Sequence, residues 1–205
     1  MRKWLPKIVL LIAIIMLISG VALSIEEVEE PAEEAPKAAQ VEVPFTAETP
    51  VAITPPGQAP EIAIIALLAG RIDLEMKKDN FLKVEGLTDI KTLIIVIGGS
   101  GKGLGSAGVD LQDEVTRANQ LIAACKEKGI KIIGMHLGGE DRRGANSQVM
   151  IDLVTPQCDY VVVRSDGNKD GIFTKICTEN KIPLTEVEKT LEVTDILKAV
   201  FQLPS

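Results

Sequence analysis

One run of apolar residues constrains the fold of this chain more than any other feature of its sequence. Residues 92–97 read Thr-Leu-Ile-Ile-Val-Ile, and the run ends at Gly98 and Gly99. A strand that is apolar at consecutive positions must be covered on both faces, as central strands of parallel sheets are. Parallel strands need long crossover connections, which are usually helices. We therefore expect strands and helices to alternate along the chain.

The flanking segments show this alternation. Apolar runs predict strands at 51–54, 130–136 and 160–163, alternating apolar and acidic residues predict an edge strand at 72–76, and 183–187 is a candidate for a short final strand. The most regular helix begins at Asp110 and ends at Gly129, with apolar residues three and four positions apart. The predicted fold class is α/β: a flavodoxin-like, doubly wound three-layer sandwich whose mainly parallel, five-stranded sheet has the order 2-1-3-4-5.

Composition excludes some classes of function. The chain has 22 Lys and Arg against 29 Asp and Glu, and residues 51–205 hold 18 basic and 21 acidic side chains. Without a basic stripe the domain lacks the usual means of binding a phosphate backbone, so no nucleic-acid partner is expected. Aromatic residues make up 3% of the chain, and the glycine-rich loops contain none to stack on a flavin ring. We expect no cofactor.

The first 48 residues differ from the rest of the chain. Residues 1–24 resemble a secretory signal peptide, with three basic residues, an apolar run at 8–18 and a cleavage site near Ser24. The alternative is an uncleaved membrane anchor. Residues 25–48 are rich in Pro and Glu and predict a disordered acidic linker, either a tether or a solubilising tail. The single α/β domain is then 49–205, with an extracytoplasmic location.

Three cysteines stand far apart in the sequence, at Cys125, Cys158 and Cys177. An odd number at wide spacings is no disulfide framework, and no paired spacing indicates zinc. In an exported chain we expect either one bridge and one free thiol or three buried thiols. Cys125 and Cys177 fall on apolar positions of predicted helices, which favours burial.

Ligands of doubly wound folds bind beyond the carboxyl ends of the strands, where the strand order reverses. Residues 98–108 lie there and contain six glycines, which predicts an open loop whose amides can face a ligand. The segment 103–108 spells GxGxxG, but it starts too late after its strand for a dinucleotide site, and no Walker A spacing is present. The candidate ligand contacts at the strand ends are Gly99, Ser100, Lys102, Gly103, His136, Arg142, Arg143, Asn168 and Asp170.

Two kinds of chemistry can be written with these residues, and neither is well supported. Ser100 or Ser106 could act as a nucleophile with His136 as base and Asp166 or Asp170 as orienting acid, but neither serine lies in a G-x-S-x-G turn. Residues 166–171 resemble the start of a calcium loop, with oxygens from Asp166, Asn168 and Asp170. Position 12 of that loop is a cysteine instead of an acid. We predict no catalytic residues and no metal site.

The loop sequences resemble a family of exported prokaryotic proteins that is described only as a domain of unknown function, DUF6305. The resemblance rests on residues 92–108 (TLIIVIGGSGKGLGSAG), 134–144 (GMHLGGEDRRG) and 167–173 (GNKDGIF), within a match over about 51–202. It implies extracytoplasmic placement and a flavodoxin-like domain. No catalytic or binding residues follow from it.

Three functional hypotheses remain open. The first is a non-enzymatic extracytoplasmic module that binds a small polar ligand at the strand ends and needs an accessible pocket there. The second is a hydrolase or transferase that needs Ser100 or Ser106 within hydrogen-bond reach of His136. The third is an envelope domain that binds a partner protein through an exposed apolar surface away from the strand ends. Membrane contact is expected only through an uncleaved 1–24.

Overall fold

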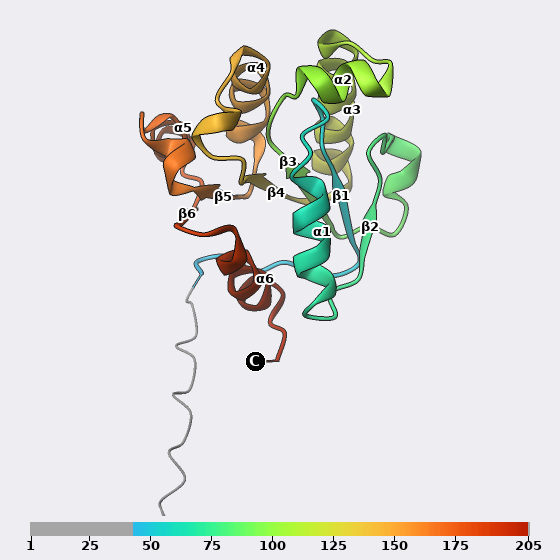
Figure 1. Cartoon of the computed structure of the whole chain (residues 1–205). Helices are drawn as coiled ribbons and strands as arrows, with labels where there is room; N and C mark the ends of the chain where they lie inside the picture. The colour runs from blue at the N-terminus through green and yellow to red at the C-terminus, as the bar shows by residue number, and fades with distance from the viewer. Residues whose placement is uncertain (1–42, 205) are drawn as a thin grey trace, which may run out of the picture. The chain divides into compact units, whose positions relative to one another are not determined.

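A computed structural model of the whole chain describes residues 43–204 and confirms the flavodoxin-like fold (Figure 1). Six parallel strands form one sheet in the order β2-β1-β3-β4-β5-β6. The strands are β1 (Val51–Thr54), β2 (Met76–Lys78), β3 (Thr92–Val96), β4 (Lys131–His136), β5 (Tyr160–Arg164) and β6 (Leu184–Val187). The strand order reverses between β1 and β3, as predicted.

The continuous apolar run occupies the middle of the sheet. Every residue of β3 is buried, and the strand pairs with β1 on one side and β4 on the other. Its side chains alternate between two cores: Ile94 and Val96 face one, while Leu93 and Ile95 face the other. A half-exposed strand would have left one of these sets in water.

Helices cover both faces of the sheet. The helices α1 (Ile62–Gly70) and α6 (Val193–Phe201) pack on one face, and α3 (Leu111–Lys128), α4 (Ala145–Val154) and α5 (Ile172–Asn180) pack on the other. In α3, Asp110 and Asp113 form a reciprocal capping box, and Gly129 ends the helix at φ 68°. Cys125, Cys158 and Cys177 are buried free thiols in the second core, so the expectation of three buried thiols is confirmed over that of one bridge.

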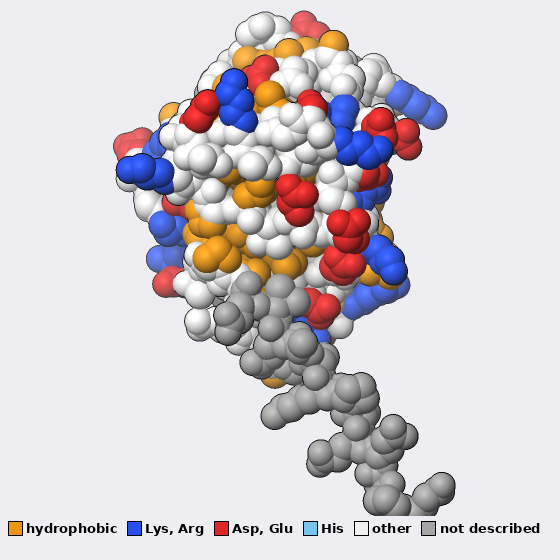
Figure 2. Space-filling view, turned by 90° about the vertical axis from the view of Figure 1, so that its left-hand side faces the viewer, with side chains coloured by type: hydrophobic (Ala, Val, Ile, Leu, Met, Phe, Trp, Pro, Cys, Tyr) orange, Lys and Arg blue, Asp and Glu red, His pale blue; other side chains and the backbone are white. Residues whose placement is uncertain are grey.

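The two ends of the sheet differ from the sequence prediction. The edge strand β2 lies at Met76–Lys78 instead of 72–76, because residues 71–73 form a turn in which Asp73 has φ 54°. The sheet has six strands instead of five, since β6 adds to β5 at the far edge. Figure 2 shows the side of the molecule that carries this edge, where hydrophobic side chains are exposed between charged ones.

The glycine-rich segment is not an open loop. Residues Gly101–Ala107 form the short helix α2, which Ser100 caps through a hydrogen bond that Oγ accepts from the Gly103 amide at 3.0 Å. A capping serine outweighs the low helix propensity of three glycines here. The helices α4 and α5 begin after glycines, Gly144 and Gly171.

The domain begins before residue 49. Val43, Phe45 and Ala47 pack against the core, and the Phe45 ring stacks on Tyr160 with centroids 5.1 Å apart. Residues 43–48, which composition assigns to the linker, therefore lie on the domain, where the Ala47 amide also donates to the Val200 carbonyl at 2.9 Å. The predicted signal peptide and the rest of the predicted linker lie outside the described residues. Within 43–204, no helix has the length and apolarity needed to span a membrane.

Candidate functional site

The loops at the carboxyl ends of the strands meet, as the fold predicts, and their backbones close the crevice between β1 and β3. The Ser100 amide donates to the Gly57 carbonyl at 2.9 Å, and the Gly99 amide donates to Ser147 Oγ at 2.9 Å. A Cβ on Gly57 would lie 2.4 Å from the Gly98 carbonyl oxygen, and one on Gly99 would lie 2.5 Å from the Asn146 backbone. Gly57 and Gly99 thus allow the backbones of neighbouring loops to touch. These contacts leave little room for a ligand in the crevice.

The candidate residues of this segment divide into buried and exposed ones. Ser100 is buried as the cap of α2, and Gly103 lies against Gln58, where an added Cβ would come within 2.5 Å of a carbonyl oxygen. Lys102 and Ser106 are exposed on α2. Lys102 and Ser106 are therefore the polar side chains of this segment that a ligand in solution can reach.

His136 ends β4 and is 1% exposed. Its Nδ1 lies 2.9 Å from the Ile97 carbonyl oxygen, which fixes the proton on that nitrogen, and Nε2 is buried without a hydrogen-bond partner among the described residues. The Phe173 ring packs beside it with centroids 5.1 Å apart. Burial lowers the pKa of His136, and the nearby positive charge of Arg143 lowers it further, against the opposing effect of the Ile97 carbonyl. The imidazole is a neutral core residue.

The two neighbouring arginines have separate partners. Arg143 makes a bidentate ion pair with Asp170 at 2.8 and 2.9 Å and also donates to the Gly167 carbonyl, so it joins the loops after β4 and β5. The Arg143 guanidinium holds the pKa of Asp170 below its usual range. Arg142 pairs with Glu61 at 3.1 Å, and 44% of its side chain remains exposed. Of the pair, Arg142 is the one open to solvent.

The side-chain oxygens of residues 166–171, which resemble the start of a calcium-binding loop, accept hydrogen bonds from separate partners. Asp166 pairs with Arg164 at 2.6 Å, and Asn168 donates to Thr174 and Glu186 while its Oδ1 accepts from the Phe173 amide. Asp170 is held by Arg143. Within the residues that the structure places, no group of His, Cys, Asp and Glu has an arrangement suited to a metal ion. The loop is a capped connection from strand to helix.

A buried ion pair near the end of β1 was missed by the sequence reasoning. Glu114 on α3 is 2% exposed, and its carboxylate accepts hydrogen bonds from Arg117, the Gly57 amide at 2.9 Å and the Gln58 side chain at 2.9 Å. Burial alone would raise the pKa of Glu114, but Arg117 and these amide donors hold it below its usual value. The carboxylate thus occupies the amide donors that an anionic ligand of the β1 loop would need.

One sequence signal could have indicated this pair. Glu114 lies one position before the apolar Val115, in the stripe that α3 turns to the sheet, and Arg117 follows three residues later, a spacing that places both on one side of a helix. The hydrogen bonds to Gly57 and Gln58 join residues more than fifty positions apart. Helical periodicity carries no information about such contacts.

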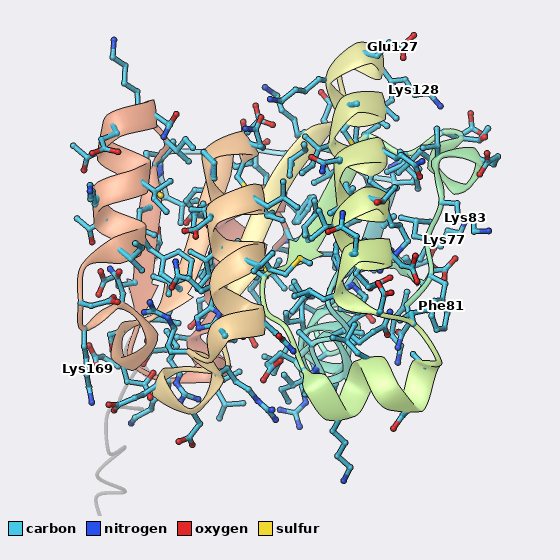
Figure 3. The ribbon with its side chains drawn as sticks, turned by 90° about the horizontal axis from the view of Figure 1, so that it is seen from above. Lys77, Phe81, Lys83, Glu127, Lys128 and Lys169 are labelled. Atoms are coloured by element: carbon cyan, nitrogen blue, oxygen red, sulfur yellow. The ribbon has the colours of Figure 1, made fainter. Side chains whose placement is uncertain are left out.

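An open groove runs along α3, beginning beside the buried Glu114. It has a volume of about 980 Å³ and runs between the helix and residues 81–85, which Figure 3 shows alongside α3. Phe81, 47% exposed, stands on one wall, and the side chain of Arg117, 11% exposed, lies at the base. We call this feature the α3 groove. It is lined by Phe81, Lys83, Val84, Glu85, Val109, Asp113, Glu114, Thr116, Arg117, Gln120, Ala123, Ala124 and Glu127.

Comparison with known proteins gives one match. The family model described as "Domain of unknown function (DUF6305)" matches residues 48–201, which is most of the chain and nearly all of the described domain. Searches of curated proteins and of solved structures found nothing that matches.

Proposed function

The chain belongs to the DUF6305 family of domains of unknown function, and from this premise we propose that it is a non-enzymatic binding module that acts outside the cytoplasm. Its location rests on the signal-like sequence of residues 1–24. N-terminal sequencing of the native protein tests that part. A chain that begins near Ile25 supports export with cleavage, and a chain that begins at Met1 contradicts cleavage.

One observation carries the non-enzymatic proposal: the candidate base and one of the two candidate nucleophiles are used within the fold, and the buried base is out of reach of the exposed Ser106. Ser100 Oγ caps α2, and His136 directs Nδ1 at the Ile97 carbonyl from a position that is 1% exposed. A general base must reach the proton that it removes. Incubation of the full chain with a fluorophosphonate probe for activated serines tests the alternative of a hydrolase. Labelling that is lost in Ser100→Ala or Ser106→Ala would overturn the proposal.

A small polar ligand at the strand ends is the first candidate for what is bound. Lys102 and Arg142 are two exposed cations there, and both project from segments that follow central strands. Native mass spectrometry of protein purified from its own organism tests this candidate. A retained small molecule that is lost from Lys102→Ala and Arg142→Ala, but kept by the exposed control Lys175→Ala, supports it.

A partner protein is the second candidate, and the geometry favours it. Backbone contacts join the loops of the crevice, whereas the α3 groove is open and extends along α3 from the buried Glu114–Arg117 pair to Glu127. Its volume is similar to that of known ligand sites. An envelope interaction domain needs an accessible surface of this kind, with an exposed aromatic residue such as Phe81 as anchor.

A further inference from the structure

The α3 groove is bounded by one continuous side of a helix. Its helical wall consists of residues at intervals of three and four along α3, from Asp113 through Arg117 and Gln120 to Glu127. The fourteen steps from Asp113 to Glu127 span about 21 Å at 1.5 Å per residue. An extended peptide of six or seven residues has the same length. The groove is thus long enough for a chain segment.

The groove also has apolar lining residues. Ala123 and Ala124 line it on α3, and Phe81 and Val84 line it on the segment beside the helix. The Phe81 amide donates to Asp79 Oδ1 at 2.8 Å, and the next residue, Leu82, is fully buried, so the backbone that carries the exposed ring is held in place. A preformed apolar surface lowers the entropy cost of binding.

The free charges of the groove are mainly negative. Glu85, Asp113 and Glu127 line it and take part in none of the ion pairs within the described residues, while Lys83 is the matching free cation. Arg117 does not change this balance, because it is neutralised by Glu114 at 2.7 Å. In Figure 3, Glu127 lies at one end of α3, and Phe81 and Lys83 lie on the segment beside the helix. The acidic side chains of the groove without an ion-pair partner among the described residues therefore outnumber the basic ones.

We propose that the α3 groove binds a basic peptide segment of a partner protein, with an apolar side chain against Phe81 and Val84 and Lys or Arg side chains near Glu85, Asp113 and Glu127. The inference rests on the proposed function of a binding module and names its partner. The excess of acidic side chains favours a basic partner, and Phe81 and Val84 favour a segment with at least one large apolar residue.

Selection from a displayed library of random 12-residue peptides on the immobilised full chain tests this proposal. The enriched peptides are synthesised, and their Kd values are measured by fluorescence anisotropy at low and at high salt. We expect an apolar residue flanked by two or more Lys or Arg residues, with binding that weakens as salt rises. No enrichment, or enrichment of peptides without basic residues, would overturn the proposal.

Matched variants place the binding in the groove. The double change Glu85→Lys with Glu127→Lys should weaken binding about tenfold, because two attractive charges become repulsive. Phe81→Ala should also weaken it about tenfold. The controls Glu179→Lys and Leu191→Ala alter an exposed acid and an exposed apolar residue elsewhere and should leave Kd within about twofold. If the control variants weaken binding as much as the groove variants do, the peptide does not bind in the α3 groove.

Two results separate this inference from the proposed function. A lysine-rich peptide without an apolar residue that binds as tightly as the selected ones would contradict a peptide groove and indicate a general polycation surface. Failure of the selection together with a retained small molecule would end the groove proposal and leave the binding module intact. The charge-reversal pair remains informative if Phe81→Ala lowers stability, because both of its positions are exposed.

Discussion

His136 is the residue most easily mistaken for a catalytic group. It is the single histidine of the chain, it ends a central strand, and the neighbouring loops supply serines and acids. Its imidazole nevertheless lies between the Phe173 ring and the Ile97 carbonyl, out of contact with solvent. A residue at the end of a strand lies where ligands of this fold usually bind. It can react only if it is also accessible, and His136 is buried.

The buried state of His136 predicts a loss of stability in weak acid. The folded protein holds the pKa of His136 below its usual value of about 6.5, whereas the unfolded chain takes up a proton as the pH falls through that value. The free energy of unfolding should therefore decrease below pH 6.5, by at most about 1.4 kcal/mol per pH unit, until the folded-state pKa is passed. Urea unfolding at pH 7.5 and 5.5 measures it.

The control for this effect is His136→Gln, which keeps a donor for the Ile97 carbonyl and has no proton to gain. Its stability should change less between the two pH values than that of the wild type, since the sequence contains no other histidine. Equal pH dependence in both proteins would show that another group is responsible.

Glu114 gives a second prediction at the scale of a residue. Glu114→Ala leaves the guanidinium of Arg117 almost buried without its partner and removes the acceptor of the Gly57 and Gln58 donors. Loss of one member of a buried pair typically costs about 3–5 kcal/mol. Chemical denaturation measures the loss, and Glu127→Ala on the exposed side of α3 should stay within about 0.5 kcal/mol.

The pair itself need not stabilise the fold relative to apolar residues. Glu114→Leu combined with Arg117→Met should therefore recover much of what Glu114→Ala loses, because no unpaired charge remains buried. A double variant as unstable as the single one would indicate that the hydrogen bonds to the β1 loop carry most of the energy.

At the scale of elements, apolar patterns predicted the central strands and α3. They did not predict the position of β2 or the existence of α2, which depend on local backbone interactions. The three-residue β2 has too few positions for a period-two pattern, so the prediction settled on the alternating segment just before it. In α2, the glycine content predicted a loop, but Ser100 caps a short helix there. The sequence predicted where the loops meet. It did not predict that backbone contacts close the crevice, because those contacts join loops that are distant in the sequence.

Two glycines near α2 should respond in opposite directions to the same change. Gly99→Ala places a Cβ 2.5 Å from the Asn146 backbone and should cost about 1–3 kcal/mol by forcing the loop away from α4. Gly105→Ala lies inside α2 with open space around it and should stabilise the protein by about 0.5–1 kcal/mol. Thermal unfolding compares them. A neutral Gly99→Ala would mean that the crevice is looser than its contacts indicate.

At the scale of the whole molecule, the parallel sheet separates two cores, and the thiols all lie in one of them. Cys125, Cys158 and Cys177 belong to the core under α3, α4 and α5, although 52 positions separate the first from the last. The sequence indicated burial of two of them from helical spacing. It could not show that all three share one core, because that depends on which face each crossover covers.

This shared core predicts that the thiols react only when the domain unfolds. Burial raises the pKa of Cys125 to about 12 and that of Cys177 to about 11, and it raises that of Cys158 as well, so little thiolate exists at pH 8. Ellman's reagent should therefore label no thiol in the native protein and three in urea, with single Cys→Ala variants showing one common rate that follows global unfolding. Ser106→Cys, at an exposed position of α2, is the control and should react at once. Rapid native labelling of any one thiol would show that part of this core opens separately, and the variant that loses the fast phase would identify the part.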